Sequence, residues 1–217
     1  RQRQMCIRDR GGAVRLANFM YGSYTGLSWT MFMLIPSFTA MFGRSALPQI
    51  AGAWTLGNRK EFERKVTVVL RSNFVIGFPL YLGLSAMSRQ ILEFLFSGRQ
   101  QEVTVSATSL FILGLGGVFL TLSSTFISIF QVIGRSDLPV KLMMPGCAIK
   151  LIFNVFTISV PAININGAAV STVIMYAAVA LGGYFALENV TGIDFHIIRR
   201  MAVPLSAGIC LLYTSDA

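Results

Sequence analysis

The stretch GRSDLPVK-LMMPGCAIKLIFNVFTISV-PAIN-INGAAVSTVIMYAAVALGGYFAL, residues Gly134–Leu187, decides the fold. It contains two apolar runs, Leu142–Val160 with the single charge Lys150, and Ile165–Leu187 with no charge. Each run is close to the roughly 20 residues that a helix needs to cross a bilayer core of about 30 Å. Because only Pro161–Asn164 separates the two runs, the sequence predicts an antiparallel hairpin of two membrane-spanning helices.

The composition of the chain is typical of a polytopic membrane protein. Of its 217 residues, 54% are hydrophobic and only 12% are charged, whereas soluble domains carry about 25% charged residues. The net charge of +9 would suggest nucleic acid in a soluble protein, but in membrane proteins Lys and Arg accumulate in cytoplasmic loops. No basic groove interleaved with aromatic residues is found. We therefore expect membrane lipids, and not nucleic acid, among the partners of this chain.

Other apolar segments of spanning length surround the hairpin. We expect spans at Tyr24–Ala53, Val66–Met87 and Val105–Phe130, and the start of another at Met201. The predicted fold class is all-α: a polytopic transmembrane helical bundle with five complete spans and a truncated sixth. Pro36 predicts a kink in the first span. The glycines and serines of Val105–Phe130 predict close packing against neighbouring helices.

The two ends of the chain differ from the rest. Arg1–Arg10 places four arginines ahead of a helix, without the apolar segment of a signal peptide behind them. Cys210–Ala217 interrupts an apolar run that has only just begun. Both ends resemble translated adapter sequence. We expect residues 1–10 and 210–217 to be non-native segments, and residues 11–209 to hold the fold of a fragment.

The cations between the spans predict the orientation in the membrane. Eight Lys or Arg residues lie in the loops on one side, which are Gly57–Lys65, Gln131–Lys141 and Glu188–Arg200. Two lie in the opposing links, Ser88–Thr104 and Pro161–Asn164. The positive-inside rule places the first set of loops in the cytoplasm. The polar link Ser88–Thr104 is then external.

The most basic of these loops is GNRKEFERK, Gly57–Lys65. Asn58 followed by Glu61 three residues later has the pattern of a helix N-terminal capping box. Two interpretations of its four cations stay open. They form either a solvated cytoplasmic face or a surface helix that rests on anionic lipid head groups.

Three polar residues within the spans are candidates for a substrate site: Lys150, Asn154 and Arg44. Lys150 is eight residues into its span, about 12 Å deep, and Asn154 follows one turn later on the same face. Charges at this depth tend to face a cavity or a partner. Either the pair faces a cavity, or it bonds other helices and only holds the bundle together. Arg44 lies nearer its helix end, where it faces the cavity or extends its charge to the interface.

The sequence does not favour an enzyme. Membrane glycan-processing enzymes need carboxylates or a base beside the substrate, and between Tyr24 and Leu187 every acid lies in a link: Glu61, Glu63, Glu93, Glu102 and Asp137. A cation-coupled multidrug exporter, the other alternative, would need an acid inside the membrane. Cys6, Cys147 and Cys210 share no metal-ligand spacing with His196, so we expect no metal and no cofactor.

Several motifs, in order and spacing from about Met20 to Leu187, resemble a known family. They are YGSYTGL, LPQIA, GNRKEFERK, GRSDLPVK, KLIFN and INGAAVSTV, beginning at Tyr21, Leu47, Gly57, Gly134, Lys150 and Ile165. The sequence resembles the polysaccharide-biosynthesis and lipid-flippase branch of the multidrug/oligosaccharidyl-lipid/polysaccharide exporters. It is most similar to the stage V sporulation protein B group, which are relatives of the lipid II flippase and act in cell-wall synthesis.

The resemblance implies the architecture and function. Such proteins have about fourteen spans in two bundles around a central cavity, so residues 11–209 would be part of the second, C-terminal bundle of a longer polypeptide. The implied function is transport of a lipid-linked anionic saccharide across the cytoplasmic membrane by alternating access, with basic cavity residues facing the phosphate. The chain departs from the family at Trp29, where those proteins tend to carry an arginine, and at Arg44, a position that is usually apolar.

Overall fold

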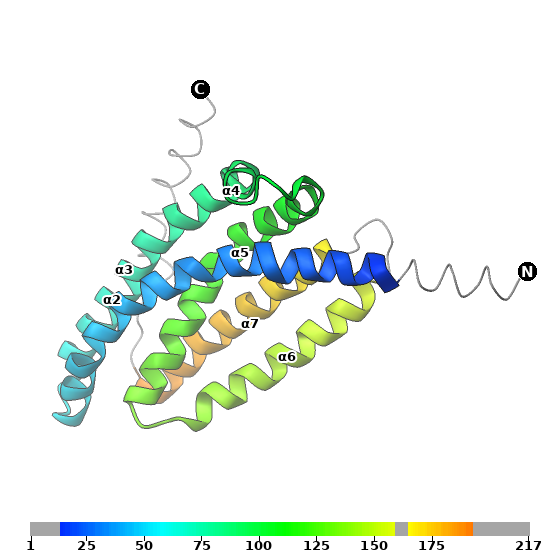
Figure 1. Ribbon diagram of the computed structural model, residues 1–217. Coiled ribbons are helices and arrows are strands. Elements are labelled where there is room, and N and C mark those ends of the chain that lie inside the picture. Colours follow the sequence, from blue (N-terminus) through cyan, green and yellow to red (C-terminus); the bar gives the residue numbers. More distant parts are fainter. Residues whose placement is uncertain (1–13, 159–164, 193–217) are drawn as a thin grey trace, which may run out of the picture.

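The computed structural model describes residues 14–158 and 165–192, and every element in this part of the chain is a helix (Figure 1). Residues 14–23 are helical and lead into the π-helical segment η1 (Tyr24–Trp29). The further helices are α2 (Thr30–Thr55), α3 (Arg59–Ala86), α4 (Ser88–Leu95), α5 (Gln100–Val132), α6 (Asp137–Ile158) and α7 (Asn166–Thr191). The predicted all-α helical bundle is confirmed.

The number of spans agrees with the prediction only approximately. The helices α3, α5, α6 and α7 are long and apolar enough to cross a membrane, and a bent pair of helices brings the number to five if it counts as one span. The truncated sixth span at Met201 lies outside the described residues, as do the ends that we expect to be non-native.

The first span is bent, but at a different place from the one predicted. Its two parts, Val14–Met41 and Arg44–Thr55, meet at 44°, so the bend follows Pro36 by several residues. A proline removes the hydrogen bond to the carbonyl four residues before it and clashes with that carbonyl. The residue four before Pro48 is Arg44, so Pro48 explains the bend better than Pro36 does.

Helix α5 is the centre of the bundle and contacts η1, α2, α3, α4, α6 and α7. Its glycines permit this. A Cβ atom added to Gly117 would lie 2.1 Å from the ring of Tyr81 on α3, and one added to Gly116 would lie 2.3 Å from Val173 on α7. The predicted role of the small residues in close packing is therefore confirmed on two sides of the helix.

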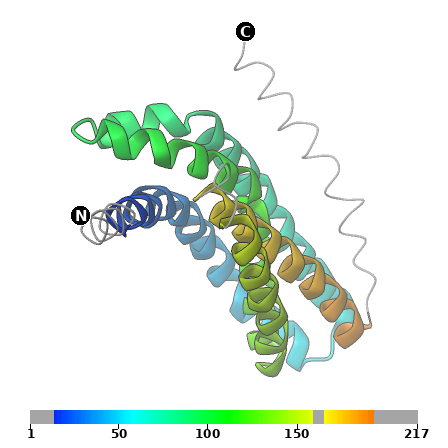
Figure 2. The same ribbon diagram turned by 90° about the vertical axis from the view of Figure 1, so that its right-hand side faces the viewer.

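The helices α6 and α7 form the predicted antiparallel hairpin, and both views show them side by side (Figures 1 and 2). Near the α7 N-terminus, a Cβ on Gly167 would lie 2.6 Å from Thr157. Further along, a Cβ on Gly146 of α6 would lie 2.7 Å from Val179 of α7. The C-terminal part of α6 thus meets the N-terminal part of α7, and an earlier part of α6 meets a later part of α7, as in an antiparallel pair. The link Pro161–Asn164 lies outside the described residues.

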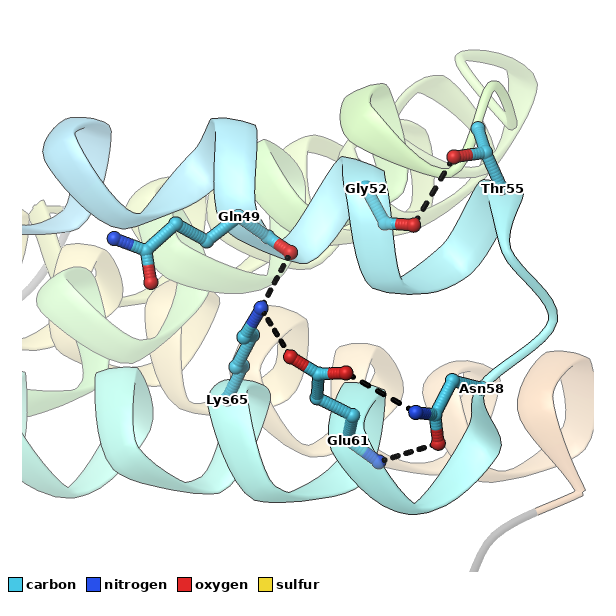
Figure 3. A network of polar contacts seen from close by, with 6 residues as sticks. All are labelled: Gln49, Gly52, Thr55, Asn58, Glu61 and Lys65. Carbon is cyan, nitrogen blue, oxygen red and sulfur yellow. Dashed lines mark hydrogen bonds and ion pairs between the residues drawn. The ribbon is translucent and has the colours of Figure 1, made fainter.

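The basic segment Gly57–Lys65 joins α2 to α3, and its helix start has the predicted cap (Figure 3). The Asn58 side-chain oxygen accepts a hydrogen bond from the Glu61 backbone N–H at 3.2 Å, and the Asn58 amide donates to the Glu61 carboxylate at 3.1 Å. Lys65 pairs with Glu61 at 2.7 Å and donates to the Gln49 carbonyl of α2 at 3.3 Å. The segment thus continues directly into the membrane-spanning helix and is not a separate surface helix.

The segments Gly57–Lys65 and Gln131–Lys141 and the C-terminus of α7 lie at the same end of the bundle. Arg59 donates to the Thr191 carbonyl at the C-terminus of α7, at 3.4 Å. One core cluster at this end contains Phe62 near the start of α3, Ile133 at the end of α5 and Leu187 in the last turns of α7. The six cations of the first two basic loops, Arg59, Lys60, Arg64, Lys65, Arg135 and Lys141, are therefore near this end, while Arg199 and Arg200 lie outside the described residues. Which side of a membrane this end faces stays a prediction.

The other end differs from the predicted polar link. Residues Ser88–Thr104 contain the eight-residue helix α4 and the first turn of α5, separated by a turn. Leu92 of α4 is fully buried in a second core cluster, which also contains Tyr81 and Leu110. This end of the bundle is therefore packed and helical, where the sequence suggested a polar loop.

Candidate functional site

Lys150 lies in the middle of α6 and faces the first span. Its ammonium nitrogen is 5.8 Å from the centre of the Trp29 ring, within the range of a cation–π contact. Lys150 is thirteen residues from the start of α6 and eight from its end, or about 20 Å and about 12 Å at the helical rise. The lysine is thus far from both ends of its helix.

No carboxylate neutralises Lys150 in the described part of the chain. The ion pairs there join residues at helix ends or in turns, and their acids are Glu61, Glu93, Glu102 and Asp137. The Lys150 side chain is half-buried. It is therefore an uncompensated cation at membrane depth, with an aromatic ring as its described neighbour.

The position of Trp29 depends on the π-helical segment. η1 ends at Trp29, and its upstream residues dock on α5: Ser106 donates to the Ser23 carbonyl at 3.0 Å, and Ser28 donates to the Ser106 carbonyl at 2.9 Å. Trp29 also lies 5.8 Å from Phe32, centre to centre, in a tilted arrangement. π-Helical segments are rare in proteins, and those that occur are often found at functional sites.

Asn154 is one turn beyond Lys150, but its described partner lies on α7. The Asn154 side-chain oxygen accepts a short hydrogen bond from the Ser171 hydroxyl. This contact lies within the α6–α7 hairpin. The structure thus brings Lys150 to Trp29 and Asn154 to Ser171.

Arg44 lies apart from this pair. It borders a cavity of about 290 Å³ between α2, α3 and α5, whose polar lining residues are Ser37, Thr39, Arg44, Asn73, Thr121, Ser124, Thr125 and Ser128. Arg44 is fifteen residues from Trp29, which corresponds to about 22 Å along a straight helix. The three predicted site residues therefore do not form one cluster.

The polar wall of this cavity was not predicted from the sequence. Asn73 is 3% exposed and donates to the Thr125 hydroxyl at 2.8 Å. An asparagine at the centre of an apolar run is a signal that could have identified the wall. The partner of Asn73 depends on how α3 and α5 are rotated against each other, which hydropathy does not encode.

No family model matches the chain. Three curated proteins are similar to it. It is 28% identical to the uncharacterized membrane protein MJ1068 of Methanocaldococcus jannaschii over 70% of this chain and 29% of that protein. It is 23% identical to the lipid II flippase MurJ of Bacillus subtilis, over 79% of this chain and 31% of that protein. It is 25% identical to the uncharacterized membrane protein YabM of Bacillus subtilis, over 81% and 31%.

The chain thus spans less than a third of the length of each of these relatives. Their similarity supports a family of the flippase or exporter type, but does not support the more specific stage V sporulation protein B group. Together with the apolar helices, it indicates a multi-pass membrane protein that is similar to a lipid II flippase.

Proposed function

We propose that this chain is part of the second helical bundle of a transporter that moves a lipid-linked anionic saccharide across the cytoplasmic membrane by alternating access. Lys150 carries the proposal, because it is an unneutralised cation in the middle of a membrane-spanning helix. The similarity to a lipid II flippase supports the class of substrate. The saccharide phosphate would supply the negative charge that the described residues beside Lys150 lack.

The magnitudes favour an anionic partner for Lys150. A lysine at the bilayer centre costs roughly 2.5–3.5 kcal/mol on insertion scales. A cation–π contact returns about 0.5–1 kcal/mol at exposed sites and about 2 kcal/mol when it is desolvated. Trp29 therefore offsets only part of the cost. An incoming phosphate would offset the rest, and Trp29 would hold the ammonium in place until the phosphate arrives.

Arg44 and Lys150 act in turn in this proposal. One phosphate cannot contact both, because about 22 Å of helix separates Arg44 from Trp29. Arg44 would attract the head group nearer the basic end of the bundle, beside the hydroxyls of its cavity. Lys150 would receive it further along. Asn154 would act on Lys150 only indirectly, by fixing α6 against α7.

The test removes the charge of Lys150 in the full-length polypeptide that contains this chain. Lys150→Met keeps the apolar volume of the side chain, and we expect it to abolish transport while membrane insertion stays intact or improves slightly. Lys150→Arg should keep part of the activity, because the charge survives but a planar guanidinium replaces a compact ammonium. Transport is measured as access of an external, membrane-impermeant probe to the lipid-linked sugar, in cells depleted of the native protein.

Lys141→Met is the matched control on the same helix. Lys141 is exposed and paired with Asp137 at 3.0 Å, so the same substitution there should leave transport nearly unchanged. Full transport by Lys150→Met at normal expression would reduce Lys150 to a packing residue and contradict the proposal.

A further inference from the structure

The short helix α4 is held against the bundle along one side only. It follows α3 after the single residue Met87, turns away from the line of α3 and packs on α5 (Figure 2). The residues on its packed side are Ser88 and Leu92, which are 6% and 0% exposed, together with the half-buried Phe96 just beyond its end. The rest of its circumference does not enter the core.

The remaining circumference divides into a polar and an apolar face. At 100° per residue, the polar face consists of Arg89, Gln90 and Glu93, and Arg89 pairs with Glu93 at 2.8 Å. The apolar face of α4 consists of Met87, Ile91, Phe94 and Leu95. Phe94 is 85% exposed, and Met87 and Leu95 are 53% and 51% exposed. The described chain therefore leaves a contiguous group of large apolar side chains on α4 uncovered.

The apolar face of α4 continues an exposed apolar stripe of α3. Leu80 and Met87 lie two turns apart on one side of the chain and are 46% and 53% exposed, and α3 is long and apolar enough to cross a membrane. The stripe of α3 thus leads directly into the apolar face of α4. The next helix, α5, is also of spanning length, so α4 connects two spans and must lie near the level of a membrane surface.

We propose that α4 lies in the bilayer interface. Its apolar face lies among the parts of the acyl chains nearest the head groups, and the Arg89–Glu93 pair is directed to water. The three faces fit this placement: one meets α5, one meets lipid and one meets solvent. A helix with a charged face and an apolar face of this kind rests in the interfacial plane. The lipid-facing boundary of the protein at this end is therefore set by α4.

The depth of two positions on α4 tests this placement. In the full-length polypeptide with its native cysteines replaced by serine, single cysteines are introduced as Phe94→Cys or Arg89→Cys and coupled to a nitroxide spin label. Both positions are exposed, so neither label disturbs packing. The protein is reconstituted into vesicles of phosphatidylcholine and phosphatidylglycerol, and collisions with oxygen, which partitions into lipid, are compared with collisions with a water-soluble nickel complex.

We expect the label at Phe94 to collide more with oxygen and the label at Arg89 to collide more with nickel. Leu95→Cys, on the same apolar face, should behave like Phe94→Cys. Nickel-dominated collisions at both Phe94 and Leu95 would show that the face is in water and overturn the proposal. A label at Phe94 that neither reagent reaches would show that another protein segment covers the face, which would also overturn it.

Discussion

The helices α5 and α6 are both apolar enough to cross a membrane, but they have opposite roles in the bundle. In their most apolar windows, 61% of α5 is buried inside the protein and only 11% of α6. α5 contacts six other elements, whereas α6 contacts α7 and, more weakly, α5. Large exposed side chains cover α6, among them Leu151, Val155 and Phe156.

The difference shows what holds a membrane bundle together. Lipid tails are as apolar as leucine, so hydrophobic side chains alone do not draw one helix to another. α5 is central because Gly114, Gly116 and Gly117 let its neighbours approach and because buried hydroxyls such as Ser109 bond across to them. α6 presents bulky side chains outward and keeps its one intramembrane cation, Lys150, near Trp29.

The largest effect should come from adding a methyl group to the centre of α5. In Gly117→Ala the new Cβ would lie 2.1 Å from the Tyr81 ring, so α3 and α5 must separate. We expect a loss of about 3 kcal/mol or more, at the upper end of overpacking costs. The measurement is reversible unfolding in mixed micelles. Gly83→Ala is the control, because nothing lies within 4 Å of its Cβ position; equal stability of the two variants would break the comparison.

An effect of intermediate size should distinguish α5 from α6 when a leucine on each helix is replaced by alanine. Leu113→Ala on α5 removes a fully buried side chain and should cost about 2–4 kcal/mol. Leu151→Ala on α6 removes a side chain that is 66% exposed, and its effect should stay within about 0.5 kcal/mol. Both are measured by the same unfolding titration. If Leu151→Ala costs as much as Leu113→Ala, a further segment packs on α6.

The smallest effect concerns the polar contact that fixes α6. A double-mutant cycle of Asn154→Ala and Ser171→Ala should give a coupling of about 0.6 kcal/mol, the average for hydrogen bonds between membrane helices. Transport measured on the same variants sharpens the result. A fall in transport well beyond the loss of stability would mean that Asn154 contacts the substrate itself.

Sequence patterns predicted the features that depend on composition along the chain. The apolar runs around Lys150 predicted the hairpin, because the length of an apolar run determines whether a helix can cross a membrane. Asn58 with Glu61 predicted the helix cap, because capping depends only on residues close in sequence. α4 was missed because its eight residues include Arg89, Gln90 and Glu93 and read as a polar link. A short amphipathic helix has too few apolar positions to be separated from a loop by hydropathy.

Contacts between helices could not be predicted in the same way. Trp29 near Lys150, and Asn73 bonded to Thr125, depend on how each helix is rotated against its neighbour. The glycines mark the face of a helix that can pack closely, but the rotation follows from them only when the helix that packs there is known. The three candidate site residues were therefore identified individually, but their division between α6 and the cavity beside α2 required the structure.

The π-helical segment Tyr24–Trp29 has a consequence for sequence length. A π turn holds one more residue than an α turn, so the wide turn accommodates a surplus residue without changing the rotation between the helical parts on either side of it. If the same residues formed regular α-helix, the surplus residue would rotate everything upstream by about 100° relative to α2. Ser23 would then turn away from Ser106, or Trp29 would turn away from Lys150. Deleting Gly26, which has nothing within 4 Å of its Cβ position, should therefore restore regular α-helix with both contacts still in phase.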